Sequence, residues 1–256
     1  MDNSNNAIRI ALDTDCLQSN IKRYIKWNYE KYPHMLLFGA TGSGKTYLLK
    51  VCLARIGRYI CSAKIILCDF KADNDFSMFP AAYRFQICSD GLALAVKILQ
   101  DRQSDIKADR YPLFLVFDEW AAYLTFLEKK AADTAKGQMA MLLMLGRSFN
   151  IHVIVSQQRV DSTFFNAGAR DNFSVIIGMG KLSKESVQMM FSEYKDSMNP
   201  RMQCGCGNLL LGGEHYTILV PQVRKLARVD HFIGKALIPC LSFGADGAAS
   251  GAQRQR

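Results

Sequence analysis

Short apolar runs recur along the chain and predict the strands of a sheet. The runs cover residues 35–38, 64–68, 113–117, 151–155, 175–177, 208–211 and 216–220. Each has the length and composition typical of a buried strand. Helical patterns separate the first five runs, so these strands should be parallel and covered by helices on both faces. The pattern therefore predicts an α/β fold with a mainly parallel central sheet.

The segments around these runs predict the remaining elements. Residues 119–149 follow a helical pattern that we expect to be interrupted near 132–137. The interruption is either a loop that contacts a substrate or an exposed connection between two helices. The last two apolar runs flank Gly212 and Gly213, which predicts a C-terminal β-hairpin that closes the edge of the sheet. The small residues at 244–251 predict a disordered tail.

These patterns divide the chain into three parts. We expect an N-terminal segment at residues 1–32 that packs on or beside the main domain, and a single α/β domain at 33–235. A C-terminal tail follows at 236–256 and is expected to be largely disordered after about residue 244. A chain of 256 residues with 49% hydrophobic content is long enough for one such domain with a well-buried sheet.

Composition narrows the class of protein. The longest apolar runs fall well short of the roughly 18 to 20 residues that cross a bilayer, and the polar start of the chain lacks the basic-then-apolar order of a secretory signal. We therefore expect no membrane segment and a cytoplasmic location, where the eight cysteines stay reduced. The formal net charge of +9 favours a polyanionic partner, although many basic chains carry solvated Lys and Arg faces without one.

Residues 39–46 read Gly-Ala-Thr-Gly-Ser-Gly-Lys-Thr, a complete G-x-x-x-x-G-K-[ST] phosphate-binding loop between a predicted strand and a predicted helix. The backbone N–H groups of such a loop surround a triphosphate, the Lys45 ammonium reaches the β and γ oxygens, and the Thr46 hydroxyl binds Mg²⁺. The loop therefore predicts a nucleoside triphosphate and Mg²⁺ as ligands. The residues expected to contact the nucleotide are Gly39, Ala40, Thr41, Gly42, Ser43, Gly44, Lys45, Thr46 and Tyr47.

Two carboxylates follow the strand predicted at 113–117. The end of that strand should place Asp118 and Glu119 beside the phosphate loop, with Asp118 holding Mg²⁺ and Glu119 acting as the general base that polarises the attacking water. The alternative is an Asp-Glu pair that only begins a helix. One further strand, at 64–68, lies between the loop and this pair along the chain. This order favours a RecA-like phosphate-loop fold over that of the small GTPases.

The strand predicted at 151–155 ends in polar side chains. A glutamine at this place can sense the γ-phosphate, and Gln157 is the first candidate. The alternative is that Gln157 and Gln158 cap the strand in solvent. His152 is expected to be a packed histidine, because nothing in the sequence pairs it with a nucleophile or a set of ligands.

Taken together, the motifs resemble the FtsK/HerA branch of hexameric DNA-pumping ATPases. Residues 33–46 resemble the family's segment around the phosphate loop, and residues 69–71 resemble a turn that the family writes Asp-Pro-Lys. Further matches follow in order at residues 116–121, 146–154 and 205–210. The resemblance covers about residues 33 to 220. Such a succession is more specific than any one motif.

The resemblance implies ATP as the nucleotide and a ring, usually of six subunits, with ATP sites between neighbours and double-stranded DNA in the central pore. Alignment of residues 156–159 with the family's Ala-Thr-Gln-Arg places Gln158 on the family's glutamine, so Gln157 and Gln158 are both candidate sensors.

An arginine supplied in trans is also implied, a contribution worth roughly 10³ to 10⁵ in rate in other phosphate-loop enzymes. Members of the family often carry Asp-Ser-Arg in the helix after the last core strand, a candidate for this arginine, whereas this chain reads Lys184-Glu185-Ser186-Val187. Arg147 and Arg170 are the remaining candidates, and either can equally be a surface or interface arginine without a catalytic part.

The sequence therefore predicts an ATP-hydrolysing double-stranded DNA translocase that acts in plasmid or mobile-element transfer, genome packaging or chromosome handling. Accessory proteins would supply membrane attachment or DNA specificity. Two alternatives are an ATP- and DNA-binding recruitment or assembly protein that pumps nothing and a helicase-type motor. By charge and position the candidate DNA contacts are Lys129, Lys130, Lys136 and Arg159, although solvated lysines are the commoner case.

Overall fold

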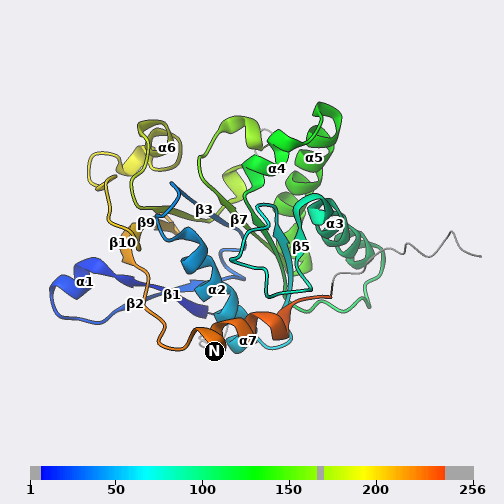
Figure 1. Ribbon diagram of the computed structural model, residues 1–256, viewed down its shortest axis with the longest axis horizontal. Coiled ribbons are helices and arrows are strands. Elements are labelled where there is room, and N and C mark those ends of the chain that lie inside the picture. Colours follow the sequence, from blue (N-terminus) through cyan, green and yellow to red (C-terminus); the bar gives the residue numbers. More distant parts are fainter. Residues whose placement is uncertain (1–6, 166–169, 240–256) are drawn as a thin grey trace, which may run out of the picture.

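One ten-stranded sheet organises residues 7–165 and 170–239, the part of the chain that the computed structural model describes (Figure 1). The strands are β1 (Ala7–Asp13), β2 (Tyr24–Asn28), β3 (Met35–Gly39), β4 (Lys64–Asp69), β5 (Tyr83–Arg84), β6 (Leu113–Asp118), β7 (Ile151–Gln157), β8 (Val175–Met179), β9 (Cys206–Leu211) and β10 (Glu214–Leu219). Their order across the sheet is β2-β1-β10-β9-β8-β3-β7-β6-β4-β5. The pairs from β8 to β5 are parallel, and those from β8 to β2 are antiparallel.

The parallel half of the sheet has the strand order of RecA-like phosphate-loop ATPases. β7 lies between β3, which precedes the phosphate loop, and β6, which ends in the acidic pair. All the strands predicted from the apolar runs are present. The predicted RecA-like α/β fold is therefore confirmed.

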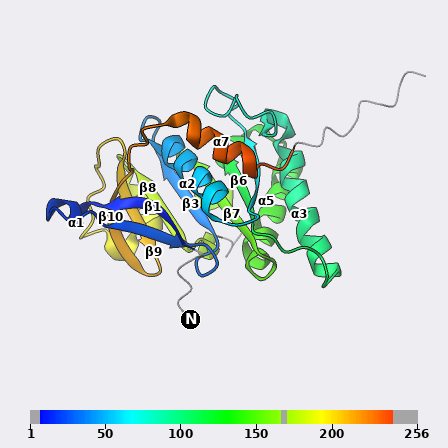
Figure 2. The ribbon, with the colours of Figure 1, turned by 90° about the horizontal axis from the view of Figure 1, so that it is seen from below.

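Helices cover both faces of the sheet. They are α1 (Thr14–Gln18), α2 (Lys45–Tyr59), α3 (Cys88–Ser104), α4 (Trp120–Phe126), α5 (Lys129–Leu145), α6 (Lys184–Met190) and α7 (Leu226–Ala236). Because successive side chains of a strand point to opposite faces, Met35 and Leu37 of β3 pack with α2 and α7, while Leu36 and Phe38 pack with α3, α4 and α5. Figure 2 shows α7 lying along α2 on the first of these faces.

The N-terminal strands extend the sheet beyond the predicted hairpin. The hairpin of β9 and β10 is confirmed, but it does not close the edge, since β1 pairs with β10 and β2 pairs with β1. The apolar runs did not predict β1 and β2. Their signal is instead a short alternation, with Ile8 and Ile10 on β1 and Ile25 and Trp27 on β2 buried between more polar neighbours.

The long helical segment is interrupted at a different place from the one predicted. Residues 132–137 lie inside α5, where Asp133 and Lys136 form an exposed ion pair one helical turn apart, at 3.5 Å. The expected loop there is wrong. The break falls at Leu127 and Glu128, whose backbones are extended and end α4 before α5 begins.

The connection from β7 to β8 also differs from its prediction. Its described part contains two short 3₁₀ turns, Ser162–Phe164 and Arg170–Asn172, in place of a crossover helix. The predicted disordered tail after about residue 244 lies outside the described residues. Within the described ranges, no helix has the length and apolar character needed to cross a membrane.

Two buried histidines lie beside the central strands. The backbone N–H of Val153 donates to His34 Nδ1 at 3.0 Å, and the ring of His152 stacks on Phe114 with centroids 4.9 Å apart. His152 is thus a packed residue, as expected, and its Nε2 lies 2.9 Å from Asn150 Oδ1. Burial lowers the pKa of His34 to about 4 and that of His152 to about 3.

These pKa shifts predict acid sensitivity of the fold. In the unfolded chain both rings titrate near pH 6.5, so below that pH the unfolded state binds protons that the folded state does not, and the free energy of unfolding decreases as the pH falls toward 4. Each ring contributes up to about 1.4 kcal/mol per pH unit. Replacement of His152 by Phe keeps an aromatic ring and removes one titration. Urea unfolding at pH 7 and pH 5 should then show a smaller stability difference than in the parent chain, and an equal difference would contradict this account.

Candidate active site

The phosphate loop connects β3 to α2 through backbone conformations that favour glycine. Gly39 and Gly44 have φ values of 149° and 96°, and Gly44 caps the first turn of α2. A Cβ atom at Gly39 would lie 2.3 Å from the carbonyl oxygen of Met179 on β8. The glycines of the motif are therefore required by the path of the loop and by its contact with the neighbouring strand.

Lys45 lies over the loop that precedes it. The side chain is buried, and its Nζ donates to the carbonyl oxygens of Gly39 at 2.7 Å and Ala40 at 3.3 Å. Burial lowers the pKa of the Lys45 ammonium, while the carboxylates of Glu119 and Asp118 oppose this shift. A phosphate oxygen is a partner that suits this buried cation, because hydrogen bonds between ionised groups are the strong ones.

Oxygen donors suited to a nucleotide and to Mg²⁺ surround Lys45. Ser43 is buried, and its Oγ has no hydrogen-bond partner among the described residues. Thr46 follows in the first turn of α2 and is half-buried. A carboxylate and a hydroxyl are the hard oxygen ligands that Mg²⁺ prefers, so Thr46 together with Asp118 fits this ion. Tyr47, in contrast, accepts a hydrogen bond at its hydroxyl from the Val223 backbone N–H at 2.7 Å, so its hydroxyl contacts the segment before α7.

The acidic residues lie at the carboxyl ends of neighbouring strands. Asp118 of β6 is in register with Asp69 of β4 on one side and with Ser156 of β7 on the other. The pKa of Asp118 is raised to about 7, chiefly by burial and also by the nearby carboxylates of Glu119 and Asp69, while the Ser156 hydrogen bond and Lys45 oppose the rise. A divalent cation at this carboxylate would compete with its proton and favour the ionised form.

Glu119 has a left-handed backbone, with φ 60° and ψ 46°, at the start of α4. This region is sparsely populated by residues other than glycine, and such conformations gather at functional sites. The Glu119 N–H donates to the Ser156 carbonyl at 2.8 Å and thereby holds the turn against β7. This strained turn ends β6 directly after Asp118. The Glu119 side chain is nine-tenths buried.

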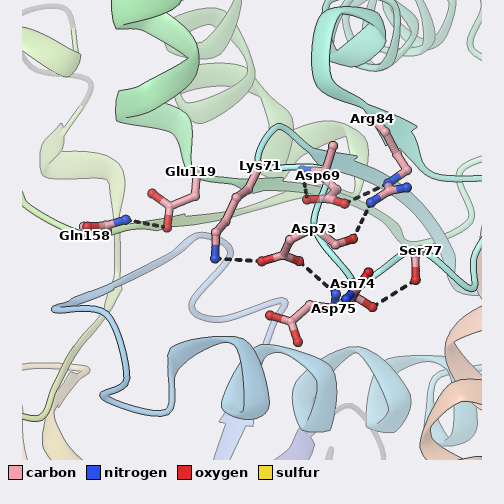
Figure 3. Close-up of polar contacts among 10 residues, drawn as sticks. Asp69, Lys71, Asp73, Asn74, Asp75, Ser77, Arg84, Glu119 and Gln158 are labelled. Carbon is pink, nitrogen blue, oxygen red and sulfur yellow. Dashed lines mark hydrogen bonds and ion pairs between the residues drawn. The ribbon is translucent and has the colours of Figure 1, made fainter.

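The two candidate glutamines occupy different environments. Gln158 is exposed, and its Nε2 donates to Glu119 Oε1 at 3.4 Å (Figure 3). Gln157 is fully buried, and neither polar atom of its amide has a partner among the described residues. The geometry therefore links Gln158 to the acidic residue and leaves Gln157 with unused hydrogen-bonding capacity inside the sheet, beside Phe38 of β3.

A hollow of about 400 Å³ adjoins the phosphate loop. Its lining includes Ala40 and Thr41 of the loop together with Gln158, Arg159 and Lys181. Arg159, predicted as a DNA contact, thus lies beside the phosphate loop of its own chain. Lys181 was missed, because it follows β8 without any motif and only the fold places it near the loop.

The other predicted basic residues are spread over the molecule. Arg147 is exposed in the turn before β7, at the amino end of that strand. The seven residues of β7 place this end roughly 20 Å from the carboxyl end of the strand, at about 3.3 Å per residue. Arg147 therefore lies away from the phosphate loop of its own chain. Lys129 and Lys130 are exposed at the start of α5. Arg170 begins a 3₁₀ turn, and its side chain lies outside the described part of the structure.

A network of charged side chains continues the acidic end of β4 (Figure 3). Arg84 Nε donates to Asp69 Oδ2 at 3.0 Å, and the same guanidinium donates to the carbonyl oxygen of Asp73. Lys71 Nζ lies 2.7 Å from Asp73 Oδ2. Burial raises the pKa of Asp69, and the hydrogen bond from Arg84 opposes that rise. The Asp69-Phe70-Lys71 motif was recognised in the sequence, but its partner Arg84 was not, since no local pattern marks it.

Glycines next to β8 and β9 contact the phosphate loop at Ser43. The Gly205 N–H donates to the Ser43 carbonyl at 3.0 Å, and a Cβ at Gly180 would lie 2.8 Å from the Ser43 Cβ. Asn208 fastens the turn before β9 through Nδ2, which donates to the Asn199 carbonyl at 2.9 Å. The late motif of the sequence thus has a structural place, next to the loop, that its position along the chain did not indicate.

Known proteins resemble this chain in sequence and in fold. No family model matches the chain. The "Ftsk domain-containing protein YdcQ" of Bacillus subtilis (strain 168) is 27% identical over 240 residues, which cover 84% of this chain and 49% of that protein. The chain thus spans about half the length of this relative.

Similar solved structures have the same fold at low sequence identity. The cytoplasmic domain of the Thermomonospora curvata type VII secretion ATPase EccC superposes with a TM-score of 0.65 at 19% identity, over 90% of this chain and 30% of that one. The pCW3 conjugation coupling protein TcpA, solved as a monomer with ATPγS, gives 0.63 at 18% identity, over 86% and 66%. The genome packaging NTPase B204 of Sulfolobus turreted icosahedral virus 2, in complex with ATP-gammaS, gives 0.50 at 16% identity, over 72% and 95%.

Proposed function

Since this chain has a motor domain of the FtsK/HerA type, we propose that it hydrolyses ATP and uses the energy to move double-stranded DNA through an oligomeric ring. The observation that carries the proposal is the convergence of Lys45, Asp118 and the linked pair of Glu119 and Gln158 at one edge of the sheet. Lys45 begins α2, Asp118 and Glu119 lie at the end of β6, and Gln158 follows β7, so the fold brings together segments that are distant in sequence. Among the similar structures, EccC is an ATPase by name and TcpA was solved with ATPγS, which supports ATPase activity in general.

Each residue has a part in hydrolysis that follows from its place. Bound Mg²⁺ would neutralise charge on the β and γ oxygens. Lys45 positions the phosphates from inside the loop, Asp118 and Thr46 hold the metal, and Glu119 takes a proton from the attacking water. Gln158 orients the Glu119 carboxylate through their hydrogen bond and thereby connects the site to the segment that follows β7.

The proposal extends to assembly and partners. A homo-hexamer or another ring would place ATP between neighbours, so that an arginine such as Arg147 or Arg170 reaches the site from the next subunit. The fold alone does not identify what the motor moves, because the similar structures include a secretion ATPase, a conjugation coupling protein and a packaging NTPase. The net charge of +9 favours DNA. A cytoplasmic location and accessory proteins for membrane attachment or DNA specificity belong to the same proposal.

DNA dependence of ATP hydrolysis tests the proposal. We expect long duplex DNA to increase the steady-state rate of phosphate release severalfold, because a translocase couples its cycle to its track. Single-stranded DNA of the same length should stimulate less, and the reverse order would favour a helicase-type motor. A rate indifferent to all DNA would contradict translocation. Single-molecule tracking then separates a pump from a recruitment protein, since only a pump moves along DNA in one direction when ATP is added.

A further inference from the structure

A basic groove lies between α2 and α7, at the end of α2 that is far from the phosphate loop. Its volume is about 400 Å³. The basic residues that line it are Arg55, Arg58, Arg224, Lys225 and Arg228. We call this hollow the α2–α7 groove. None of these five residues belongs to the nucleotide site described above.

The two helices that form the groove are in backbone contact. A Cβ at Gly57 would lie 2.1 Å from the carbonyl oxygen of Phe232, so only glycine permits this approach. The Arg58 guanidinium lies 5.0 Å from the centroid of the Tyr59 ring and 5.1 Å from that of Phe232, distances typical of cation–π contacts. The walls of the groove are therefore fixed by close packing of the two helices, and Arg58 is positioned there by its contacts with two aromatic rings.

The positive charge of the groove is not neutralised within the described residues. The ion pairs found there are Arg23–Asp13, Lys71–Asp73, Arg84–Asp69 and Lys136–Asp133, none of which involves a groove residue. Arg55 donates to the carbonyl oxygen of Arg9, and the only acidic residue on α7, Asp230, does not line the groove. Cations gathered in this way repel one another and attract an anion.

We propose that the α2–α7 groove binds the backbone phosphates of double-stranded DNA. Arginine presents a planar fork that matches phosphate oxygens, and four of the five basic residues are arginines. A small ligand is disfavoured, because small-ligand sites bury roughly 70 to 90% of the ligand surface, whereas Arg224, Lys225, Arg228 and Tyr59 are all exposed.

The groove and the nucleotide site lie at opposite ends of α2. Lys45 begins this helix and Arg58 lies near its end, a separation of roughly 20 Å at about 1.5 Å per residue. DNA in the groove leaves the phosphate loop accessible. The inference deepens the proposed function and rests on it only for the choice of DNA as the polyanion. It does not require that ATP hydrolysis drives movement.

Binding of a fluorescent DNA duplex without nucleotide, measured by anisotropy at several salt concentrations, tests the groove. The slope of log K against log salt is negative, and each lost phosphate contact reduces its magnitude by about 0.9. The double variant Arg58→Gln/Arg228→Gln should therefore weaken binding and reduce the magnitude of the slope by about 1.8. The matched control is Lys107→Gln/Lys195→Gln, which removes two exposed charges outside the groove. Its slope should stay close to that of the parent chain.

A second variant separates charge from packing. Loss of Arg58 removes its contacts with two rings, whereas Arg224→Gln/Lys225→Gln changes only exposed side chains. This pair should also weaken binding and reduce the magnitude of the salt slope. Unchanged affinity and slope in both groove variants would overturn the proposal, including the case in which the groove instead binds an acidic protein segment. Competition by inorganic phosphate at concentrations too low to change the ionic strength would point to a site for the free ion and would also overturn it.

The two proposals fail in different ways. If duplex DNA does not stimulate hydrolysis but the groove variants still lose DNA affinity, translocation is contradicted and the groove stands. If DNA stimulates hydrolysis and the groove variants bind as the parent chain does, the groove is contradicted and the motor stands. The groove measurements use no ATP, so a defect in hydrolysis does not affect them.

Discussion

Replacement of Glu119 by Gln is expected to remove most ATP hydrolysis while ATP binding remains. The carboxylate is the proposed base, and general base catalysis contributes about 10² to 10⁴ in rate, so kcat should fall by about that factor. The amide keeps the size of the side chain and can still hydrogen-bond to Gln158, which now contacts Glu119 Oε1 at 3.4 Å. The phosphate loop is untouched. The measurement is phosphate release under saturating ATP, together with a direct binding titration.

The control for this variant is Glu128→Gln. Glu128 is an exposed glutamate at the start of α5 whose side chain makes no capping hydrogen bond. Its replacement changes the net charge by the same amount and should leave kcat near that of the parent chain. Retention of full activity in Glu119→Gln would remove Glu119 as the base and would require another group, such as a carboxylate from a neighbouring subunit.

Replacement of Lys45 by Ala is expected to weaken ATP binding and to reduce hydrolysis with it. A hydrogen bond that involves a charged group is worth about 1.5 to 3 kcal/mol, which corresponds to roughly ten- to a hundredfold in affinity. Burial already lowers the pKa of Lys45, so the charge is costly in the free protein. Its removal should therefore weaken ATP binding without a comparable loss of thermal stability. Titration calorimetry with a non-hydrolysable ATP analogue and a melting curve of the free protein measure the two quantities.

Lys50→Ala serves as the comparison on the same helix. Lys50 lies one turn further along α2, with its ammonium 5.3 Å from the centroid of the Phe76 ring. The Lys50→Ala variant loses the same charge at a distance from the phosphate loop, so it should bind the analogue as the parent chain does. If Lys45→Ala keeps its affinity, or if both variants lose it equally, the proposed role of Lys45 is wrong.

The parts of the site that the sequence predicted are those formed by neighbours along the chain. The phosphate loop needs only a glycine path and the first turn of a helix, and Gly39 and Gly44 have the conformations that the motif implies. Asp118 and Glu119 follow an apolar run, and the end of that run marks the end of β6. The place of the helix break was predicted wrongly. The small and polar residues near Gly137 suggested a turn, but they lie within α5, where the alanines pack into the core and the polar residues face outward.

Other parts depend on segments that are distant in sequence. Arg84 meets Asp69 across a loop, Gly205 donates to Ser43, and Lys181 reaches the hollow beside the loop from the end of β8. None of these residues belongs to a pattern of neighbouring positions that marks such a contact. The α2–α7 groove is a further case, since Arg58 and Arg228 are remote in sequence and α7 was not predicted.

The sequence by itself determined the strands of the parallel half of the sheet other than β5, the phosphate loop and the acidic pair, because backbone conformation and the burial of apolar side chains act over a few neighbouring residues. Only the tertiary structure decided which strands are adjacent, that β1 and β2 extend the sheet, that Gln158 rather than Gln157 contacts Glu119, and that unpaired cations gather at the far end of α2. These features depend on packing between distant segments, where a residue's neighbours are set by the fold.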